Sequence, residues 1–151
     1  MAWQLAVATA LYVLCGFRTV QCDTEQLLRM LECRTDLSFW QDLKLSNYGC
    51  FCGYGGEGEP MDEIDNCCKL HDDCYGRCQT EIQACCDVED FTELIYQFRV
   101  DCNAGTIECE DSRECYACVC DCDKVLADCV ADNARHFDPA HVQNCTSTSG
   151  R

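Results

Sequence analysis

The chain has 151 residues, 19 of them cysteine, and a formal net charge of −16. This length predicts one domain, and such a density of cysteine indicates a disulfide scaffold made in an oxidising compartment. Zinc binding is the competing interpretation, but the cysteines do not form two regular CxxC pairs. Nucleic acid is excluded as a partner, because phosphate binding needs clustered Lys and Arg.

The first residues predict secretion. Residues 5–17, LAVATALYVLCGF, form an apolar run of signal-peptide length that is too short to span a bilayer. We expect a signal peptide at 1–22, an extracellular protein, and one domain at 23–151. Removal of Cys15 and Cys22 from the 19 cysteines leaves 17, an odd number. Either one thiol stays free or pairs between chains, or cleavage falls before Cys22.

The next segments predict a short helix, a loop and a long helix. Residues 24–33 place leucines at helical spacing and predict a short amphipathic helix. Residues 48–60, YGCFCGYGGEGEP, form a glycine-rich loop. Asp62 follows as a candidate N-cap of a helix that continues to about Cys78.

The second half predicts a hairpin and another long helix. Residues 96–109 place β-prone side chains around an Asn-Ala-Gly turn, which indicates a small β-hairpin. Residues 112–134 contain neither Gly nor Pro and predict the second long helix. The fold class is therefore mainly α and disulfide-rich.

The cysteines of the two long helices have mirrored spacing. In the first helix they follow one another by seven and four residues, and in the second by four and seven. Such steps keep side chains on one helical face. The reversed order fits two antiparallel helices joined bridge by bridge, in the pairs Cys67–Cys129, Cys74–Cys122 and Cys78–Cys118.

This pairing places a histidine opposite an acid. His71 lies on the bridged face, and the matching level of the other helix brings Asp123 within reach. A carboxylate that orients an imidazole is the arrangement of a general base. Tyr75, one turn after His71, can join through its hydroxyl. A purely structural His–Asp pair is the simpler alternative.

The glycine loop predicts a cation site. It contains no Lys, so a phosphate-binding P-loop is disfavoured. Its carbonyls can instead face Ca²⁺, which accepts main-chain oxygens together with a carboxylate such as that of Asp72. The spacing of an EF-hand is missing. The alternative is that the glycines only fit a tight turn between bridged cysteines.

These residues resemble a known family. YGCFCGYGGEGEPMDEIDNCCKLHDDCY is similar to the calcium loop and catalytic helix of secreted phospholipase A2, and CYACVCDCD is similar to the start of its second long helix. The resemblance implies Ca²⁺ held by the carbonyls of Phe51, Gly53 and Gly55 and by the carboxylate of Asp72. Phe51 stands where the family usually has Tyr, a change that a carbonyl ligand tolerates.

The resemblance also implies the reaction. It predicts calcium-dependent hydrolysis of the sn-2 ester of a glycerophospholipid, by a monomer at a phospholipid membrane or micelle interface. Water is activated by the base, and the implied catalytic residues are His71, Asp123, Tyr75, Tyr96 and the amide of Gly53.

Further residues are implied around the substrate. Leu27 and Leu31 would line the acyl channel, and Phe39, Trp40 and Tyr54 would touch lipid.

A disulfide set is implied as well, and its first pair is similar to that of the pancreatic and elapid-type branch. It consists of Cys33–Cys102, Cys50–Cys145, Cys52–Cys68, Cys67–Cys129, Cys74–Cys122, Cys109–Cys120, and Cys115 with either Cys85 or Cys86. Cys78 and Cys118 lie outside this set, so their pairing depends on the mirrored spacing alone.

The alternative function is a non-catalytic binding protein on the same scaffold: a receptor ligand, toxin subunit or calcium-binding matrix component. Its usual mark would be a changed histidine or a calcium-site Asp replaced by Lys. His71, Asp72 and Asp123 are all present here, which favours the enzyme.

Overall fold

The structure is a computed structural model that describes residues 22–35, 45–53 and 55–145. Its regular elements in chain order are α2 (Cys22–Arg34), α4 (Glu63–Glu81), η1 (Gln83–Cys85), η2 (Phe91–Glu93), β1 (Phe98–Asp101), β2 (Thr106–Cys109), α5 (Glu114–Asn133), η3 (Ala134–His136) and η4 (Pro139–His141).

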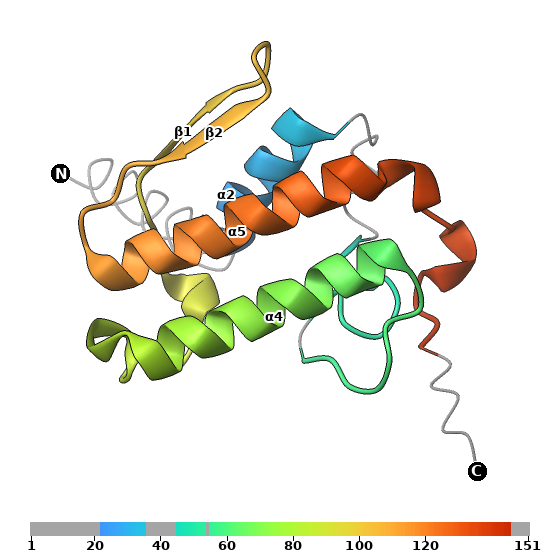
Figure 1. The fold of residues 1–151 in the computed structure, drawn as a ribbon, viewed down its shortest axis with the longest axis horizontal. Coiled ribbons are helices and arrows are strands. Elements are labelled where there is room, and N and C mark those ends of the chain that lie inside the picture. Colours follow the sequence, from blue (N-terminus) through green and yellow to red (C-terminus); the bar gives the residue numbers. More distant parts are fainter. Residues whose placement is uncertain (1–21, 36–44, 54, 146–151) are drawn as a thin grey trace, which may run out of the picture.

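Two long antiparallel helices form the body of the molecule. Figure 1 shows α4 and α5 side by side, with α2 packed against α5. Asp62 is the N-cap of α4, because its side chain accepts a hydrogen bond from the backbone N–H of Asp65. The core lies between the three helices, and its most deeply buried apolar side chains include Met30, Ile64, Val119 and Val130. Each long helix thus has one buried and one polar face.

Disulfides confirm the helix pairing. The three bridges expected from mirrored spacing are present, including Cys78–Cys118. All bridges implied by the resemblance are present too. The open choice for Cys115 falls on Cys85, which is fully buried. Among the described residues Cys86 is the free cysteine, and it is exposed.

The remaining expectations match the elements to within a few residues. The antiparallel strands β1 and β2 pair Phe98 with Cys109 and Asp101 with Thr106. The turn between them contains Gly105 at φ +63°, a conformation that glycine adopts without strain. α4 begins directly after its predicted N-cap, and the other helix ends lie one to three residues from their predicted boundaries.

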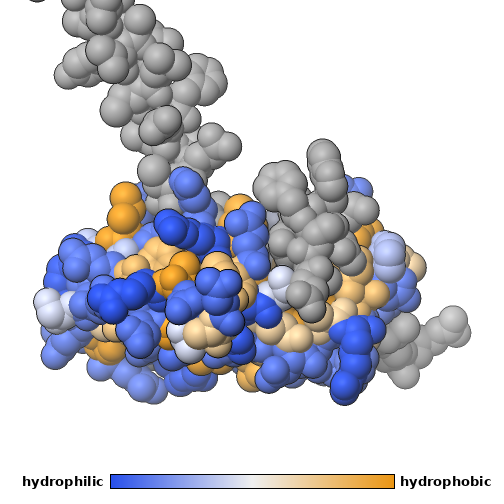
Figure 2. All heavy atoms as spheres, turned by 90° about the horizontal axis from the view of Figure 1, so that it is seen from above, coloured by the Kyte–Doolittle hydropathy of each residue, from blue (hydrophilic) through white to orange (hydrophobic). Residues whose placement is uncertain are grey.

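On the face shown in Figure 2, apolar side chains lie between larger polar areas. Within the residues that the structure describes, none of the helices combines the length and apolar character needed to cross a membrane. The predicted signal peptide, apart from Cys22, and the three aromatic residues expected to touch lipid lie outside the described residues.

Candidate active site

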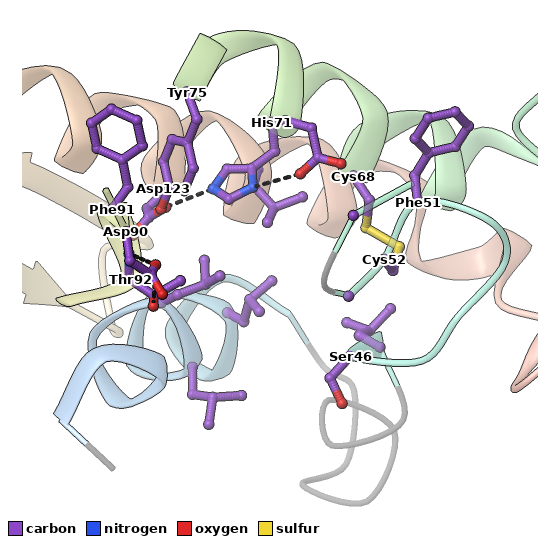
Figure 3. A pocket seen from close by; sticks show the side chains of 18 of the residues that line it. Ser46, Phe51, Cys52, Cys68, His71, Tyr75, Asp90, Phe91, Thr92 and Asp123 are labelled. Atoms are coloured by element: carbon purple, nitrogen blue, oxygen red, sulfur yellow. Dashed lines mark hydrogen bonds and ion pairs between the residues drawn. A yellow bond between two sulfur atoms is a disulfide. The ribbon is translucent and has the colours of Figure 1, made fainter. Parts of the chain in front are cut away.

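A histidine and an aspartate meet between the two long helices. The Nε2 atom of His71 in α4 lies 2.7 Å from Oδ1 of Asp123 in α5, and Figure 3 shows the two side chains pointing toward each other. Both are largely buried, with side-chain exposures of 11% and 4%. A carboxylate only accepts hydrogen bonds, so Nε2 carries the proton and Nδ1 is left as a proton acceptor.

Two tyrosines complete the surroundings of this carboxylate. The Tyr75 hydroxyl donates to Oδ1 of Asp123 at 2.5 Å, and the Tyr96 hydroxyl donates to Oδ2. Burial, followed by the charge of Asp123, raises the pKa of both hydroxyls, so they remain protonated donors. Asp123 therefore accepts three hydrogen bonds, which compensate its burial and fix the orientation of the imidazole.

Covalent bridges hold this pair in place. His71 lies between Cys67 and Cys74 on α4, and these cysteines are bonded to Cys129 and Cys122 on α5. The histidine is thus bracketed along its helix by two links to the helix that carries its partner. The separation of the imidazole from the carboxylate is set by the scaffold.

The glycine loop is anchored to α4 by a second buried acid. Asp65 is fully buried and accepts hydrogen bonds from the backbone N–H groups of Cys50, Phe51 and Met61, at 2.7 to 2.9 Å. Gly49 lies against it at φ +61°, and a Cβ there would stand 2.2 Å from the carboxyl carbon. Only glycine fits that position, and the first turn of α4 thereby fixes the start of the loop.

The next glycines continue this tight path. Gly53 has φ +146°, and a Cβ on it would stand 2.5 Å from the Ser46 carbonyl oxygen. Gly55 has φ +70°. A Cβ on Gly56 would stand 2.3 Å from the Phe51 ring. Gly53 and Gly56 therefore each lie where a neighbouring part of the loop leaves no room for a side chain.

The loop and Asp72 fit a calcium ion by their chemistry. Phe51, Gly53, Gly55, His71 and Asp72 all line one pocket. Main-chain carbonyls and a carboxylate are the hard oxygen ligands that Ca²⁺ takes. Burial, together with neighbouring Asp73, raises the pKa of Asp72 despite the opposing effects of His71 and Lys69. A partly desolvated carboxylate of this kind gains from a bound cation.

The remaining lining of the pocket is largely apolar, although Glu89, Asp90 and Thr92 also reach it. It has a volume of about 350 Å³. Leu27, Leu28 and Leu31 of α2 line one wall, as expected for Leu27 and Leu31, and Leu94 contributes from another segment. In Figure 3 the Cys52–Cys68 bridge and Phe91 lie on opposite sides of His71. A long acyl chain and a polar group can thus be held against the same histidine.

Sequence reasoning missed part of the site. Asp65 gave a weak signal, as an acid in the first turn of a helix next to a glycine loop. The sequence gives no signal for the contacts of His136 and His141, and His141 is not an ordinary surface residue. Its Nδ1 atom lies 2.7 Å from Oδ2 of Asp62, which is largely buried. His136 lies 3.3 Å from Glu63. Both contacts join residues more than 70 positions apart, which no local pattern reveals.

Comparison with known proteins identifies a family and several relatives that are similar to this chain. The family model described as phospholipase A2 matches residues 24–141. Basic phospholipase A2 nigroxin A of Micrurus nigrocinctus is 40% identical over 80% of this chain and 97% of its own length. Acidic phospholipase A2 PL-I of Walterinnesia aegyptia is 38% identical over 83% of this chain and 87% of its own. Acidic phospholipase A2 3 of Naja sagittifera is 36% identical over 76% of this chain and 84% of its own length.

Proposed function

The chain belongs to the phospholipase A2 family, and on that premise we propose that it is a secreted, calcium-dependent enzyme. It hydrolyses the sn-2 ester of glycerophospholipids and releases a fatty acid and a lysophospholipid. It acts as a monomer on phospholipid membranes or micelles. The contact between His71 and Asp123, 2.7 Å apart and largely buried beside a pocket of suitable size, is the observation that carries the proposal.

The chemistry follows from the protonation of His71. Its Nδ1 atom accepts a proton from water as that water attacks the ester carbonyl, and Asp123 stabilises the resulting imidazolium. The tetrahedral intermediate then collapses with cleavage of the sn-2 C–O bond, and the imidazolium returns its proton to the leaving glycerol oxygen. Tyr75 and Tyr96 keep the carboxylate in place through their hydroxyls. No acyl-enzyme is formed, so no serine or cysteine nucleophile is needed.

The oxyanion and the substrate phosphate need positive charge. The carbonyls of Phe51, Gly53 and Gly55 and the carboxylate of Asp72 would hold Ca²⁺, which supplies a Lewis acid when bound. The amide of Gly53 serves as the second donor to the oxyanion. The leucines of α2 bind the acyl chain, because they line the same pocket as His71.

A non-catalytic binding protein on this scaffold explains less of the structure. Such a protein needs neither an oriented imidazole nor two tyrosine donors on its carboxylate partner. The described residues contain both, so we favour the enzyme.

Release of free fatty acid from phosphatidylcholine micelles tests the function. We expect release that stops with EDTA and returns with added Ca²⁺. His71→Gln should lower the rate by about 10²–10⁴-fold, the usual contribution of a positioned general base. His136→Gln is the matched control and should keep the wild-type rate, since it lies outside the pocket lining. An unchanged rate in His71→Gln, or full activity in EDTA, would contradict the proposal.

A further inference from the structure

The second histidine contact joins the C-terminal segment to the helix that carries the proposed base. His141 ends η4, and its Nδ1 atom lies 2.7 Å from Oδ2 of Asp62, the N-cap of α4. The same oxygen accepts a hydrogen bond from the Tyr48 hydroxyl at 2.5 Å. The other oxygen, Oδ1, accepts the N–H of Asp65. One carboxylate therefore connects the helix, the start of the glycine loop and the C-terminal segment.

The direction of these hydrogen bonds follows from the groups involved. Burial, followed by the hydrogen bond to Asp62, raises the pKa of the Tyr48 hydroxyl, which stays a donor. Burial opposes ionisation of Asp62, but hydrogen bonds from Tyr48, the Asp65 N–H and His141 outweigh it and lower the pKa. The carboxylate is ionised and only accepts. His141 must therefore carry its proton on Nδ1 in this contact.

The backbone repeats the connection on both sides of the imidazole. The Gly49 N–H donates to the His141 carbonyl at 2.9 Å, and the Gln143 N–H donates to the Asn47 carbonyl at 2.7 Å. Tyr48 is fully buried, and its ring stacks on Phe137 with 5.2 Å between centroids. Tyr48 is thus enclosed between α4 and the C-terminal segment, and the backbone of its two neighbours is hydrogen-bonded to that segment.

We propose that His141 is a positioning residue for the calcium loop. The loop's first residues are held by two carboxylates of α4: Asp65 binds the amides of residues 50 and 51, and Asp62 binds the Tyr48 hydroxyl. His141 shares the Asp62 oxygen with Tyr48 and keeps that carboxylate directed at the loop. The inference rests on the proposed calcium site, because Phe51, three residues after Tyr48, supplies one of its carbonyls.

His136 provides a matched comparison within the same segment. Its Nδ1 atom faces Glu63, the residue next to Asp62, at 3.3 Å, and its Nε2 atom accepts from Arg135. The Glu63 side chain is 61% exposed, whereas that of Asp62 is 11% exposed. The polar contacts of His136 do not involve residues 47–53. Loss of His136 therefore removes a C-terminal histidine contact without touching the loop anchor.

Calcium affinity and loop protection test the proposal separately from activity. Calcium titration by calorimetry should show an affinity about tenfold weaker in His141→Ala, the order expected for one hydrogen bond to a charged group. Hydrogen exchange in the calcium-free protein should be faster at the amides of residues 47–51. His141→Asn retains an N–H donor near the Nδ1 position and should restore most of the calcium affinity and most of the exchange protection. His136→Ala should match the wild type in both.

A second variant keeps the test informative if His141→Ala folds poorly. Tyr48→Phe retains the buried ring and removes the hydroxyl, which donates to Asp62 and also accepts the N–H of Asp138. It should weaken calcium binding in the same direction. Wild-type affinity and exchange in both His141→Ala and Tyr48→Phe would overturn the inference. Equal losses in His141→Ala and His136→Ala would overturn it as well, since they indicate general loosening of the segment. Absence of calcium binding by the wild type would instead overturn the proposed function.

Discussion

Three acidic side chains organise the pocket, and each accepts several hydrogen bonds. Asp123 accepts from one imidazole and two hydroxyls, Asp65 from three backbone amides, and Asp62 from a hydroxyl, an imidazole and an amide. A buried charge without such partners costs several kcal/mol. The hydrogen bonds that compensate each carboxylate also fix the groups that donate them. Burial of these charges therefore goes together with precise placement of the loop and the imidazole.

The lowered pKa of Asp62 predicts a contribution to acid stability. A carboxyl with a pKa below its ordinary value of 3.8 binds fewer protons in the folded state than in the unfolded state. Its stabilisation is therefore complete above that value and is lost as the pH falls through the folded-state pKa. In urea unfolding between pH 2 and pH 5, Asp62→Asn should show a shallower dependence on pH than the wild type.

The choice of Asn separates charge from helix capping. Asn is as good an N-cap as Asp, so the start of α4 should be retained. Asp132→Asn, at an exposed position of α5, controls for the loss of one negative charge. A wild-type slope in Asp62→Asn would refute the assignment.

At the scale of the elements, the long helices were predictable and the anchoring contacts were not. The pairing of α4 with α5 is predicted by cysteines spaced four and seven residues apart, because a helix turns every 3.6 residues. The same register placed His71 opposite Asp123. The contact of His141 with Asp62 spans 79 positions and depends on the irregular path of η3 and η4. No period encodes such a path, so only the folded chain reveals it.

Spacing also could not decide between neighbouring cysteines. Cys85 and Cys86 are adjacent, so the sequence alone allows either of them to bond to Cys115. The 3₁₀ turn η1 directs Cys85 into the core and leaves Cys86 exposed. That outcome depends on local backbone direction within a short turn, which composition does not determine.

The third helix bridge should stabilise the fold without serving the reaction. The double variant Cys78→Ser, Cys118→Ser removes one bridge, but the neighbouring bridge Cys74–Cys122 still joins the helices. The unfolded chain therefore gains only a little conformational freedom. We expect a loss of about 2 kcal/mol in unfolding free energy, measured by guanidinium denaturation. The rate of fatty acid release should stay near that of the wild type, because His71 remains bracketed by the other two bridges. A large loss of rate would show that this bridge also sets the site.

At the scale of the whole molecule, charge governs the approach to lipid. The net charge of −16 becomes −17 if residues 1–22 are removed, since Arg18 is their only charged residue. Polar side chains dominate the face in Figure 2. A protein of this charge is repelled by anionic lipid over a distance set by ionic strength.

The enzyme should therefore prefer zwitterionic lipid. At about 0.01 M salt, hydrolysis of phosphatidylcholine vesicles should be several times faster than that of phosphatidylglycerol vesicles, and the gap should narrow near 0.2 M as screening shortens the repulsion. Fatty acid release at fixed calcium concentration measures both rates. Equal or faster turnover of the anionic vesicles at low salt would contradict this expectation.

The two bridges that flank His71 have a mechanical consequence. Enzymes that close over their substrates bring catalytic groups together by hinge or shear. Here the proposed base His71 and its partner Asp123 belong to helices that are already joined by a disulfide on either side of His71, so substrate binding is not needed to bring them together. On the proposed mechanism, variation in activity would then come from access of lipid to the pocket and not from alignment of His71 with Asp123.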